Sequence, residues 1–246
     1  MTGQANSPLK TGHSTGFMMR SHGSVDKHFD LELKYSSDRD HVLQCQRLRY
    51  KVYCVERGWY DEVTFEDGRE HDEFDDRSVH ALITRLRTGE GVGVVRMILP
   101  ENNGNGPNLP IQEIDPSPLS LISNHVDFDR MAEISRFAIT RDYLKAQVGQ
   151  SIGQKRQGFS HLSLGLLRAV VLMSRDNNIR YLCATMEYTL LTLFARVGIR
   201  FIPLGEPRSY HGIRQPCYCD LNQVKDEMRM LAPEFFSQVF DSNDPF

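Results

Sequence analysis

The spacing of hydrophobic and polar residues predicts a strand, a helix and a hairpin in the N-terminal part of the chain. Residues 29–35 alternate apolar and charged side chains, which is the period of a strand with one buried face. Over 38–57 the apolar residues recur at intervals of three and four, which predicts an amphipathic helix, and Asp38 is placed to cap it. Two β-branched runs, 79–83 and 92–99, flank a glycine-containing turn and predict a hairpin.

The rest of the chain alternates helices and strands. A segment rich in Asn, Gly and Pro, 100–118, predicts an irregular loop, and MAEISRFAIT at 131–140 predicts a strand. Beyond it the pattern predicts a helix over 157–175, a strand over 181–186, a helix over 189–197 closed by Gly198, strands over 200–204 and 215–221, and a helix over 222–240. This order indicates the α/β (α+β) class, with a mixed, twisted central sheet and helices on both faces.

The N-terminal end of the chain lacks such a pattern. Residues 1–27 are polar and aperiodic, so they bury too little apolar surface to offset the entropy of ordering. We expect a disordered tail there, followed by one domain over 28–246. The histidines at 13, 22 and 28 fit no metal-ligand spacing, and no metal site is expected.

Composition narrows the class of protein. The chain has 246 residues and a net charge of -3, which gives no electrostatic case for binding nucleic acid. It has no apolar run long enough to span a membrane and no apolar leader, so we expect no transmembrane segment and a cytoplasmic location. The five cysteines include no C-x-x-C pair, which indicates reduced thiols in the core.

Charged residues interrupt the strand at 131–140. Glu133 and Arg136 lie within an otherwise strand-like run, and ionised groups there cost solvation energy unless polar groups lie beside them. The strand is therefore a candidate site. The alternative is a solvated Glu133–Arg136 ion pair at the edge of a sheet.

Two other segments carry candidate chemistry. Arg49 and Tyr53 are four residues apart on the predicted helix, and Trp59 comes after the end of that helix. These residues could equally be a surface arginine stacked on a packed tyrosine. The turn-prone segment 63–76 carries an acidic trio that could bind a cation or hold a base, or could simply be solvated. The trio is Glu70, Asp72 and Asp75.

The order of elements and these charged positions resemble a known family. The order is that of the GNAT (acetyltransferase-like) fold, and the charged residues resemble those of one branch of it, the acyl-homoserine lactone synthases. In that family an arginine is followed by an aromatic residue four positions on and a tryptophan six further, as are Arg49, Tyr53 and Trp59. The other matching positions are the acidic trio, Arg96 in a strand that ends in Leu-Pro, and Glu133, Ser135, Arg136 and Phe137.

The C-terminal half differs from those synthases. Residues 186–221 instead resemble the acyltransferases associated with PEP-CTERM/exosortase systems, relatives of the N-acyl amino acid synthases, and this resemblance extends over most of 29–240. It implies a single GNAT-like acyltransferase domain without a tightly bound cofactor. Such an enzyme moves a fatty acyl group from an acyl thioester, on acyl carrier protein or coenzyme A, to a small amine such as an amino acid. Two alternatives remain: an acyl-homoserine lactone synthase that uses S-adenosylmethionine, and a non-catalytic module that binds acyl carrier protein.

The resemblance assigns roles to the candidate residues. Glu70 is the expected general base, directly or through a water, and Glu133 is the competing base. Asp72 and Asp75 would hold the ammonium form of the acceptor. Strand amides around 137–139 would bind pantetheine and the developing oxyanion. The remaining residues, Arg49, Arg96 and Arg136, would orient the carboxylates and the substrate.

The segment after the central strand predicts the acyl donor. Coenzyme A-dependent relatives carry a glycine-rich loop there, and the nearest candidate, 150–155, places Lys155 where a small residue should stand. We therefore predict acyl carrier protein as the donor. A basic cluster would meet its acidic surface, unless these are ordinary solvated charges: Arg141, Lys145, Lys155, Arg156 and Arg168.

Overall fold

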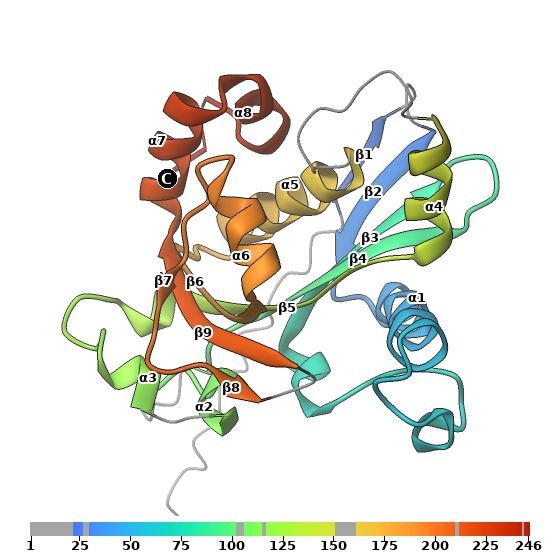
Figure 1. Ribbon diagram of the computed structural model, residues 1–246, viewed down its shortest axis with the longest axis horizontal. Coiled ribbons are helices and arrows are strands. Elements are labelled where there is room, and N and C mark those ends of the chain that lie inside the picture. Colours follow the sequence, from blue (N-terminus) through green and yellow to red (C-terminus); the bar gives the residue numbers. More distant parts are fainter. Residues whose placement is uncertain are drawn as a thin grey trace, which may run out of the picture.

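A computed structural model describes residues 22–26, 30–101, 106–114, 117–150, 161–209, 212–242 and 244–246. Its centre is one nine-stranded sheet, in the order β1-β2-β3-β4-β5-β6-β9-β7, with β8 also paired to β9 (Figure 1). All neighbouring strands are antiparallel except β5 and β6, which are parallel. The strands are β1 (His22–Asp26), β2 (Leu31–Ser36), β3 (Ser78–Arg85), β4 (Gly91–Ile98), β5 (Met131–Ile139), β6 (Tyr181–Glu187), β7 (Ile202–Pro203), β8 (Arg208–Ser209) and β9 (Ile213–Asp220).

Helices cover both faces of the sheet, as predicted (Figure 1). One face carries α1 (Arg39–Tyr50), which continues into a π-helical turn, Lys51–Glu56. The other face carries α5 (His161–Asp176), α6 (Tyr188–Ala195), α7 (Leu221–Leu231) and α8 (Pro233–Val239). The smaller elements are α2 (Ile111–Ile114), α3 (Ser117–Ser120), α4 (Arg141–Gln150) and the 3₁₀ turns Glu62–Phe65, Glu73–Arg77 and Phe128–Arg130.

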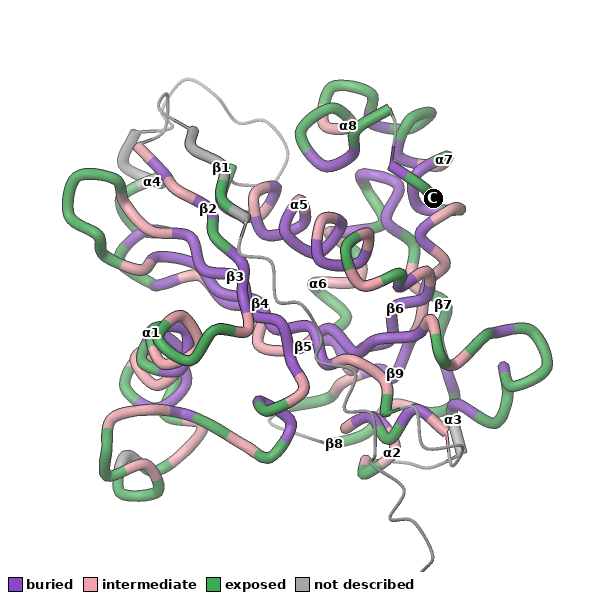
Figure 2. Tube along the Cα trace, turned by 180° about the vertical axis from the view of Figure 1, so that it is seen from behind, coloured by how far each residue is buried: buried purple, intermediate pink, exposed green. Residues whose placement is uncertain are grey.

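The largest core lies between the sheet and α5. The apolar positions that predict this helix, among them Leu162, Leu166 and Met173, are fully buried against the strands. Each such side chain contributes about 1.5–3 kcal/mol on leaving water. The burial trace shows the same result, because the middle strands of the sheet are buried along nearly their whole length (Figure 2). The core thus holds the central strands rigidly in place.

On the opposite face, α1 packs against the sheet through a shorter apolar stripe. Cys45, Leu48 and Val52 contact Leu82 and Val94. The prediction placed Val55 on the same stripe, but Val55 is 56% exposed. The π-helical turn explains the difference, because its wider winding breaks the 3.6-residue spacing after residue 50.

Several predicted boundaries were wrong. Residues 22–26 form β1 rather than part of a disordered tail, and residues 1–21 lie outside the described residues. The predicted terminal helix breaks at Ala232, because Pro233 cannot continue the helical hydrogen bonds and instead starts α8. Asp38 occupies the N-cap position of α1, but its side chain makes no capping hydrogen bond. The strand predicted over 200–204 is only two residues long, and α4 was not predicted.

The cysteines behave as predicted. All five are free and buried, and burial raises the pKa of the Cys45 thiol to about 12. They serve as small core residues rather than as nucleophiles. Among the described helices, none is both long and apolar enough to span a membrane.

We expect Gly198→Ala to destabilise the fold by more than the cost of its backbone angle alone. Gly198 has φ +82°, and a Cβ there would lie 2.7 Å from the Met228 backbone in α7. A left-handed conformation costs an L-residue about 1–2 kcal/mol, and displacing a packed helix adds to that cost. Gly205 is the matched control, because it has φ +69° with nothing within 4 Å of an added Cβ. Urea unfolding of the two alanine variants measures the difference, and equal losses would contradict the steric explanation.

Candidate active site

The site forms where β5 and β6 separate. The two strands are paired only from Met131 to Glu133 and from Tyr181 to Cys183, although β5 continues to Ile139 and β6 to Glu187. The strands therefore diverge over their C-terminal halves. Residues from both diverging segments line one cavity.

A bulge in β5 aims Arg136 at this gap. Val94 pairs with Ala138 and Arg96 with Ser135, so β5 has one more residue than β4 between these pairs. Arg136 lies in the bulge with φ +53°, a left-handed angle that is uncommon outside glycine. A strained backbone angle of this kind persists where surrounding contacts stabilise it, and here the hydrogen bonds of the Arg136 guanidinium do so.

Arg136 and Arg49 bind Glu70 from two sides. Arg136 donates to both carboxylate oxygens of Glu70, at 2.7 to 3.2 Å, and Arg49 Nε donates to Glu70 Oε2. Arg49 and Glu70 are 0% and 1% exposed. The Glu70 backbone N–H also donates to the Gln46 carbonyl, at 3.2 Å, which anchors the loop to α1. Glu70 is therefore a buried, fully engaged carboxylate rather than part of a solvated loop.

Arg96 connects these three residues to Asp72 and Asp75. Its Nη1 donates to Asp72 Oδ1 at 2.5 Å and to Asp75 Oδ1 at 2.7 Å, and its Nε donates to Ser135 Oγ at 2.9 Å. Asp72 also accepts from Arg136 Nη2 at 3.0 Å, and Asp75 from Arg49 Nη1 at 2.7 Å. The result is one continuous network of three arginines and three carboxylates. We call it the arginine–carboxylate network: Arg49, Arg96, Arg136, Glu70, Asp72 and Asp75.

Local backbone structure presents the aspartates to the arginines. Asp72 is the N-cap of the 3₁₀ turn that contains Asp75, and the two form a capping box. The Asp72 side chain accepts a backbone N–H of the turn, and the Asp75 side chain accepts the backbone N–H of Asp72. Gln46 Nε2 donates to the second oxygen of Asp75, at 3.0 Å. The carboxylates are thus fixed before any substrate binds.

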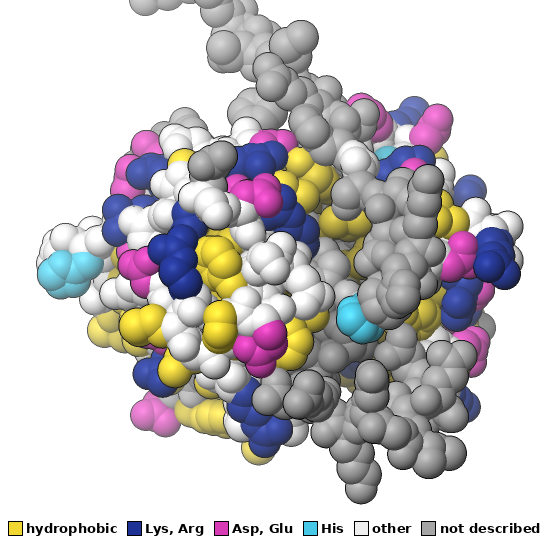
Figure 3. All heavy atoms as spheres, turned by 90° about the horizontal axis from the view of Figure 1, so that it is seen from above, with side chains coloured by type: hydrophobic (Ala, Val, Ile, Leu, Met, Phe, Trp, Pro, Cys, Tyr) yellow, Lys and Arg dark blue, Asp and Glu magenta, His cyan; other side chains and the backbone are white. Residues whose placement is uncertain are grey.

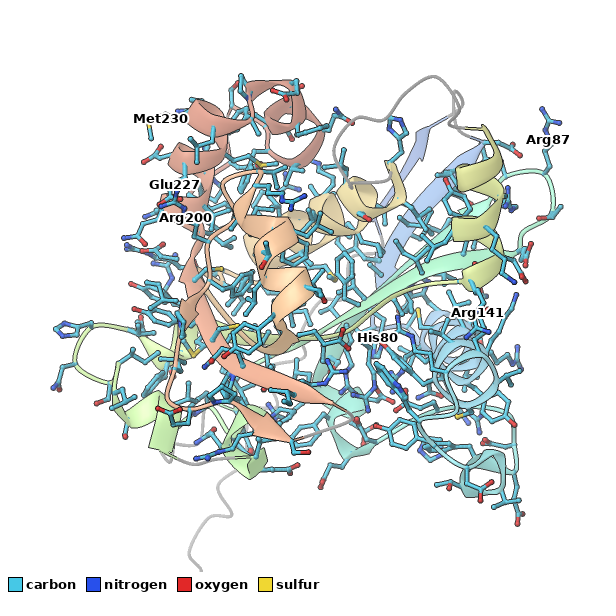
Figure 4. The ribbon with its side chains drawn as sticks, in the orientation of Figure 1. His80, Arg87, Arg141, Arg200, Glu227 and Met230 are labelled. Carbon is cyan, nitrogen blue, oxygen red and sulfur yellow. The ribbon has the colours of Figure 1, made fainter. Side chains whose placement is uncertain are left out.

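The network lowers the pKa of two of its carboxylates. Burial acts to raise the pKa of Glu70, but Arg49 and Arg136 outweigh it and bring the pKa to about 2. Arg49 and Arg96 hold the pKa of Asp75 well below its usual range against the same opposing effect of burial. His80 lies beside Asp75, near the middle of the molecule (Figure 4), and burial and Arg49 lower its pKa to about 3. At neutral pH the carboxylates are charged and His80 is neutral.

Glu133 has the opposite environment. It is 4% exposed, and its Oε2 accepts the Ile111 backbone N–H at 2.7 Å. Burial raises the pKa of Glu133 to about 7, although the Ile111 N–H, Arg96 and Arg136 oppose the rise. It lies on a central strand, so the alternative of a solvated Glu133–Arg136 pair at a sheet edge is wrong. A carboxylate with this pKa can accept and return a proton near neutral pH.

The cavity next to Glu133 has a volume of about 1020 Å³. Near β5 it is lined by Glu133 and the exposed faces of the network. The lining that comes from α5, α6, α7 and the end of α8 is apolar and includes Leu167, Val170, Leu193, Phe194, Val224 and Phe240. The cavity therefore has a polar part near Glu133 and an apolar part, which we call the apolar channel.

Aromatic residues also line the cavity. Tyr53 and Trp59 stack with their ring centroids 5.2 Å apart, and both line the cavity. Arg136 lies 5.9 Å from the Tyr53 ring centroid, which joins this aromatic pair to the network. The spacing of Arg49, Tyr53 and Trp59 therefore reflects real proximity, and the alternative of a surface arginine is wrong because Arg49 is fully buried.

The structure brings all eleven predicted site residues together, but not all of them face the cavity. Nine line it, and Arg49 and Asp75 lie behind them. Sequence reasoning missed Gln46 and the Ile111 N–H, which donate to Asp75 and Glu133, and it missed His80, which lies 3.7 Å from Asp75. Gln46 and His80 carried a usable signal, since each is a polar residue at a buried position of an otherwise apolar pattern. The Ile111 N–H carried none, because its role depends on the path of a loop.

Comparisons with known proteins support the fold. Residues 48–153 match the acetyltransferase (GNAT) domain family, while no curated protein matches the sequence. The structure is similar to that of BjaI, a CoA-dependent acyl-homoserine lactone synthase solved with SAM and isopentyl-CoA, at 22% identity and a TM-score of 0.56, over 93% of this chain and 95% of that one. It is also similar to the AHL synthase LasI, at 20% identity and a TM-score of 0.53, over 87% of this chain and 96% of that one.

A third similarity is weaker. FeeM, an N-acyl amino acid synthase from uncultured soil microbes, matches at 16% identity and a TM-score of 0.49, over 87% of this chain and 97% of that one. A likeness at that level carries no argument. The two stronger similarities confirm the prediction of a single GNAT-like domain of the α+β class. The domain match supports the prediction of an acyltransferase.

We expect Asp75→Asn to cost about 3–5 kcal/mol of stability, because it removes one charge from a buried network and leaves Arg49 and Arg96 with an uncompensated positive charge. Urea unfolding at pH 7 measures the loss. Asp226→Asn is the control, since Asp226 is 77% exposed in a 4.0 Å ion pair with Arg229 and should change stability by no more than about 0.5 kcal/mol. Similar losses in both variants would show that the network does not act as a buried unit.

Proposed function

We propose that the protein is an N-acyltransferase that moves a fatty acyl group from an acyl thioester to a small amine. The observation that carries this proposal is Glu133, a buried carboxylate with a pKa of about 7, at the point where the diverging strands open into an apolar channel. Acyl transfer to an amine requires a base for the amine proton and a dry channel for the acyl chain. Both requirements are met in one cavity.

Glu133 is the general base in this proposal. It removes a proton from the acceptor ammonium, directly or through a water, and the free amine attacks the thioester carbonyl. The attack gives a tetrahedral intermediate whose nitrogen carries one proton too many for an amide. As the carbon–sulfur bond breaks, that proton passes to the leaving thiolate, directly or through a water. A base whose pKa is near the working pH is the most effective for such a transfer, which favours Glu133 over Glu70. With a pKa of about 2, Glu70 binds protons too weakly, and its oxygens already accept from Arg49 and Arg136.

Glu70 is then a positioning residue. It fixes Arg136, whose backbone lies in the bulge of β5. Arg136 and Arg96 in turn face the cavity with Asp72, at the place where the acceptor ammonium would bind. Asp75 contributes by holding Arg49 and Arg96, because it lies behind the cavity lining.

Backbone amides of β5 supply the oxyanion site. The Thr140 N–H donates to the Val92 carbonyl in β4, at 3.0 Å, so the N–H of Ile139 points to the opposite side, toward the gap beside β6. An N–H that faces such a gap can bind the pantetheine arm or the developing negative charge of the tetrahedral intermediate. Phe137 and Ile139 line the cavity on this strand.

The apolar channel is the proposed acyl site. Phe194 lines this channel, with its ring centroid 5.8 Å from that of Phe137 and 6.3 Å from that of Phe201. Val224 of α7 and Val239 and Phe240 at the end of α8 also line it. A channel lined by apolar side chains suits a fatty acyl chain rather than an acetyl group. The predicted association with PEP-CTERM/exosortase systems stays a prediction.

We expect Glu133→Gln to lower kcat by about 100-fold or more with the fold intact, because the amide keeps the shape of the side chain but cannot take the proton. In the unaltered enzyme, kcat/KM should rise with pH as Glu133 loses its proton, and level off above about pH 7. Thiol-release kinetics from pH 5 to 9 test both statements.

The Glu70→Gln variant tests whether Glu70 is the general base or a positioning residue. It should also reduce the rate, but its residual activity should keep the rise near pH 7, whereas Glu133→Gln should lose it. A pH profile that survives in Glu133→Gln would exclude Glu133 as the base. Mass spectrometry of the products, with S-adenosylmethionine among the acceptors offered, separates an N-acyl amine synthase from an acyl-homoserine lactone synthase.

We propose acyl carrier protein as the acyl donor. Fewer basic residues are available to contact it than the sequence suggested. Arg168 donates to the Val239 carbonyl and pairs with Asp241 and Asp244 in the C-terminal segment, so it is not part of a docking surface. Arg141 donates to the Glu56 carbonyl. Lys145 is exposed on α4, and the glycine-containing segment with Lys155 and Arg156 lies outside the described residues. On the face shown in Figure 3, acidic and basic side chains are interspersed.

Kinetics with matched acyl chains on both donors test this proposal. We expect a higher kcat/KM with acyl carrier protein than with coenzyme A, and a loss of that advantage as salt rises from about 0.05 to 0.5 M, because salt screens exposed charges. An equal or higher kcat/KM with acyl-coenzyme A at every salt concentration would overturn it.

A further inference from the structure

The segment after α8 is held against α5 by polar contacts that the proposed reaction does not use. Arg168 of α5 donates to the Val239 carbonyl at 3.0 Å, and it pairs with Asp241 and, at 3.4 Å, with Asp244. The Asp241 backbone N–H donates to Asp244 Oδ2 at 2.7 Å, which closes a turn between the two aspartates. Arg168 therefore binds the end of α8 and the residues after it at three points.

The helix α7 holds the same segment from a second side. Lys225 of α7 is only 5% exposed, and its ammonium group donates to the Asp244 carbonyl at 2.5 Å. The Asp244 side chain is also buried, and Arg175 of α5 lies 3.5 Å from it. A buried charge that loses its partner is strongly destabilising, so these groups depend on one another. We call them the C-terminal clasp: Arg168, Arg175, Lys225, Asp241 and Asp244.

The C-terminal clasp positions two side chains of the apolar channel. Val239 is the last residue of α8 and Phe240 is the next residue, and both are buried and line the channel. The helix α8 has only seven residues, and an isolated helix of that length is not stable in water. Its position must therefore come from its tertiary contacts, which are the core and the clasp.

Val239 and Phe240 lie at the end of the cavity that is farther from Glu133. Glu133 accepts the Ile111 N–H of α2, and Figures 1 and 2 show α2 and α8 at opposite ends of the molecule. The same cavity is lined by Tyr53, which continues α1 on the other face of the sheet. An acyl chain with its thioester beside Glu133 would therefore extend through the gap between β5 and β6 toward α8.

We propose that the C-terminal clasp sets the longest acyl chain that the channel accepts, by holding Val239 and Phe240 where the end of the chain would meet them. The inference rests on the proposed acyl transfer and narrows its donor. The Phe236 ring stacks on the Phe240 ring with the centroids 5.7 Å apart, which fixes this wall further. A close-packed wall resists extra methylenes, because it cannot take up added volume without strain. Phe240 is the specificity-determining residue, and Asp244 is a positioning residue that acts through it.

Chain-length profiles test the role of Phe240. Thiol-release kinetics are run with a series of saturated acyl thioesters that differ by two carbons. Phe240→Ala and the milder Phe240→Leu should move the optimum to longer chains, and each methylene that the wider channel accepts should raise kcat/KM by about fourfold, the value of burying one methylene group. Val239→Phe should move the optimum to shorter chains. An unchanged optimum in both Phe240 variants would overturn the proposal.

A second phenylalanine of α8 is the matched control for Phe240. Phe235 packs against the same core but is not among the residues that line the channel. Phe235→Ala should therefore lower stability, measured by urea unfolding, without moving the chain-length optimum. A shift equal to that of Phe240→Ala would show that loosening of α8 changes the preference, and it would overturn the assignment of Phe240.

The Asp244→Asn variant tests the C-terminal clasp itself. It removes the charge that Arg168 and Arg175 share, so α8 should be held less firmly and longer chains should bind with a lower KM, while kcat for short chains is retained. Glu234→Gln should keep the original profile, because Glu234 is exposed in the first turn of α8. An Asp244→Asn profile identical to that of the unaltered enzyme would overturn the role of the clasp.

Calorimetry separates this inference from the proposed function. Acyl-pantetheine thioethers of the same chain lengths carry the acyl chain but cannot transfer it. A binding profile that Phe240→Ala moves to longer chains would support the channel limit even if the enzyme acylated no amine, a result that would remove the proposed function. Acyl transfer with a chain-length profile that no variant changes would leave the proposed function intact and remove the inference.

Discussion

The structure depends on burying three guanidinium groups together with the carboxylates that neutralise them. Each ion alone would lose several kcal/mol on leaving water, so neither the arginines nor the acids could occupy these positions separately. Together they join α1, the loop before β3, and the strands β4 and β5. The loop that carries Glu70 and Asp72 is therefore positioned by charge, and the aromatic lining of the cavity depends on that position.

The same network gives the carboxylates different pKa values, because it lowers the pKa of Glu70 while burial raises that of Glu133. Glu70, Asp72 and Asp75 share three arginines, so the positive and negative charges balance within the network. Glu133 is left outside this balance, with a backbone N–H as its hydrogen-bond partner. The two glutamates were both reasonable bases from sequence, because each is a carboxylate within the matching motif, and neither motif shows which arginines lie beside it in the fold. Their difference arises from the number of guanidinium groups within reach, which only the fold determines.

Local sequence patterns predicted the helices and strands that many apolar contacts stabilise. They failed where a single residue or a contact distant in sequence determines the local structure. The stripe of α5 and the alternation of β2 are buried as expected because many side chains contribute to each. α4 has a weak apolar pattern, so no periodicity revealed it, and Tyr143 is its buried residue among those whose burial is described. The π-helical turn after α1 is likewise invisible to a 3.6-residue pattern, and it turned Val55 outward.

The short pairing of β5 with β6 has a mechanical consequence. Only three residue pairs connect the sheet formed by β1 to β5 with the strands β6, β9 and β7, so backbone hydrogen bonds along this seam are few. Regions with few such bonds open locally at a lower free energy than the rest of a domain, and their amides exchange with solvent sooner. A ligand that spans the gap would tie the two sides of the sheet together and slow that exchange. A substrate bound across the gap would therefore also hold the two parts of the sheet together, and amide exchange at the seam would report how firmly each substrate does so.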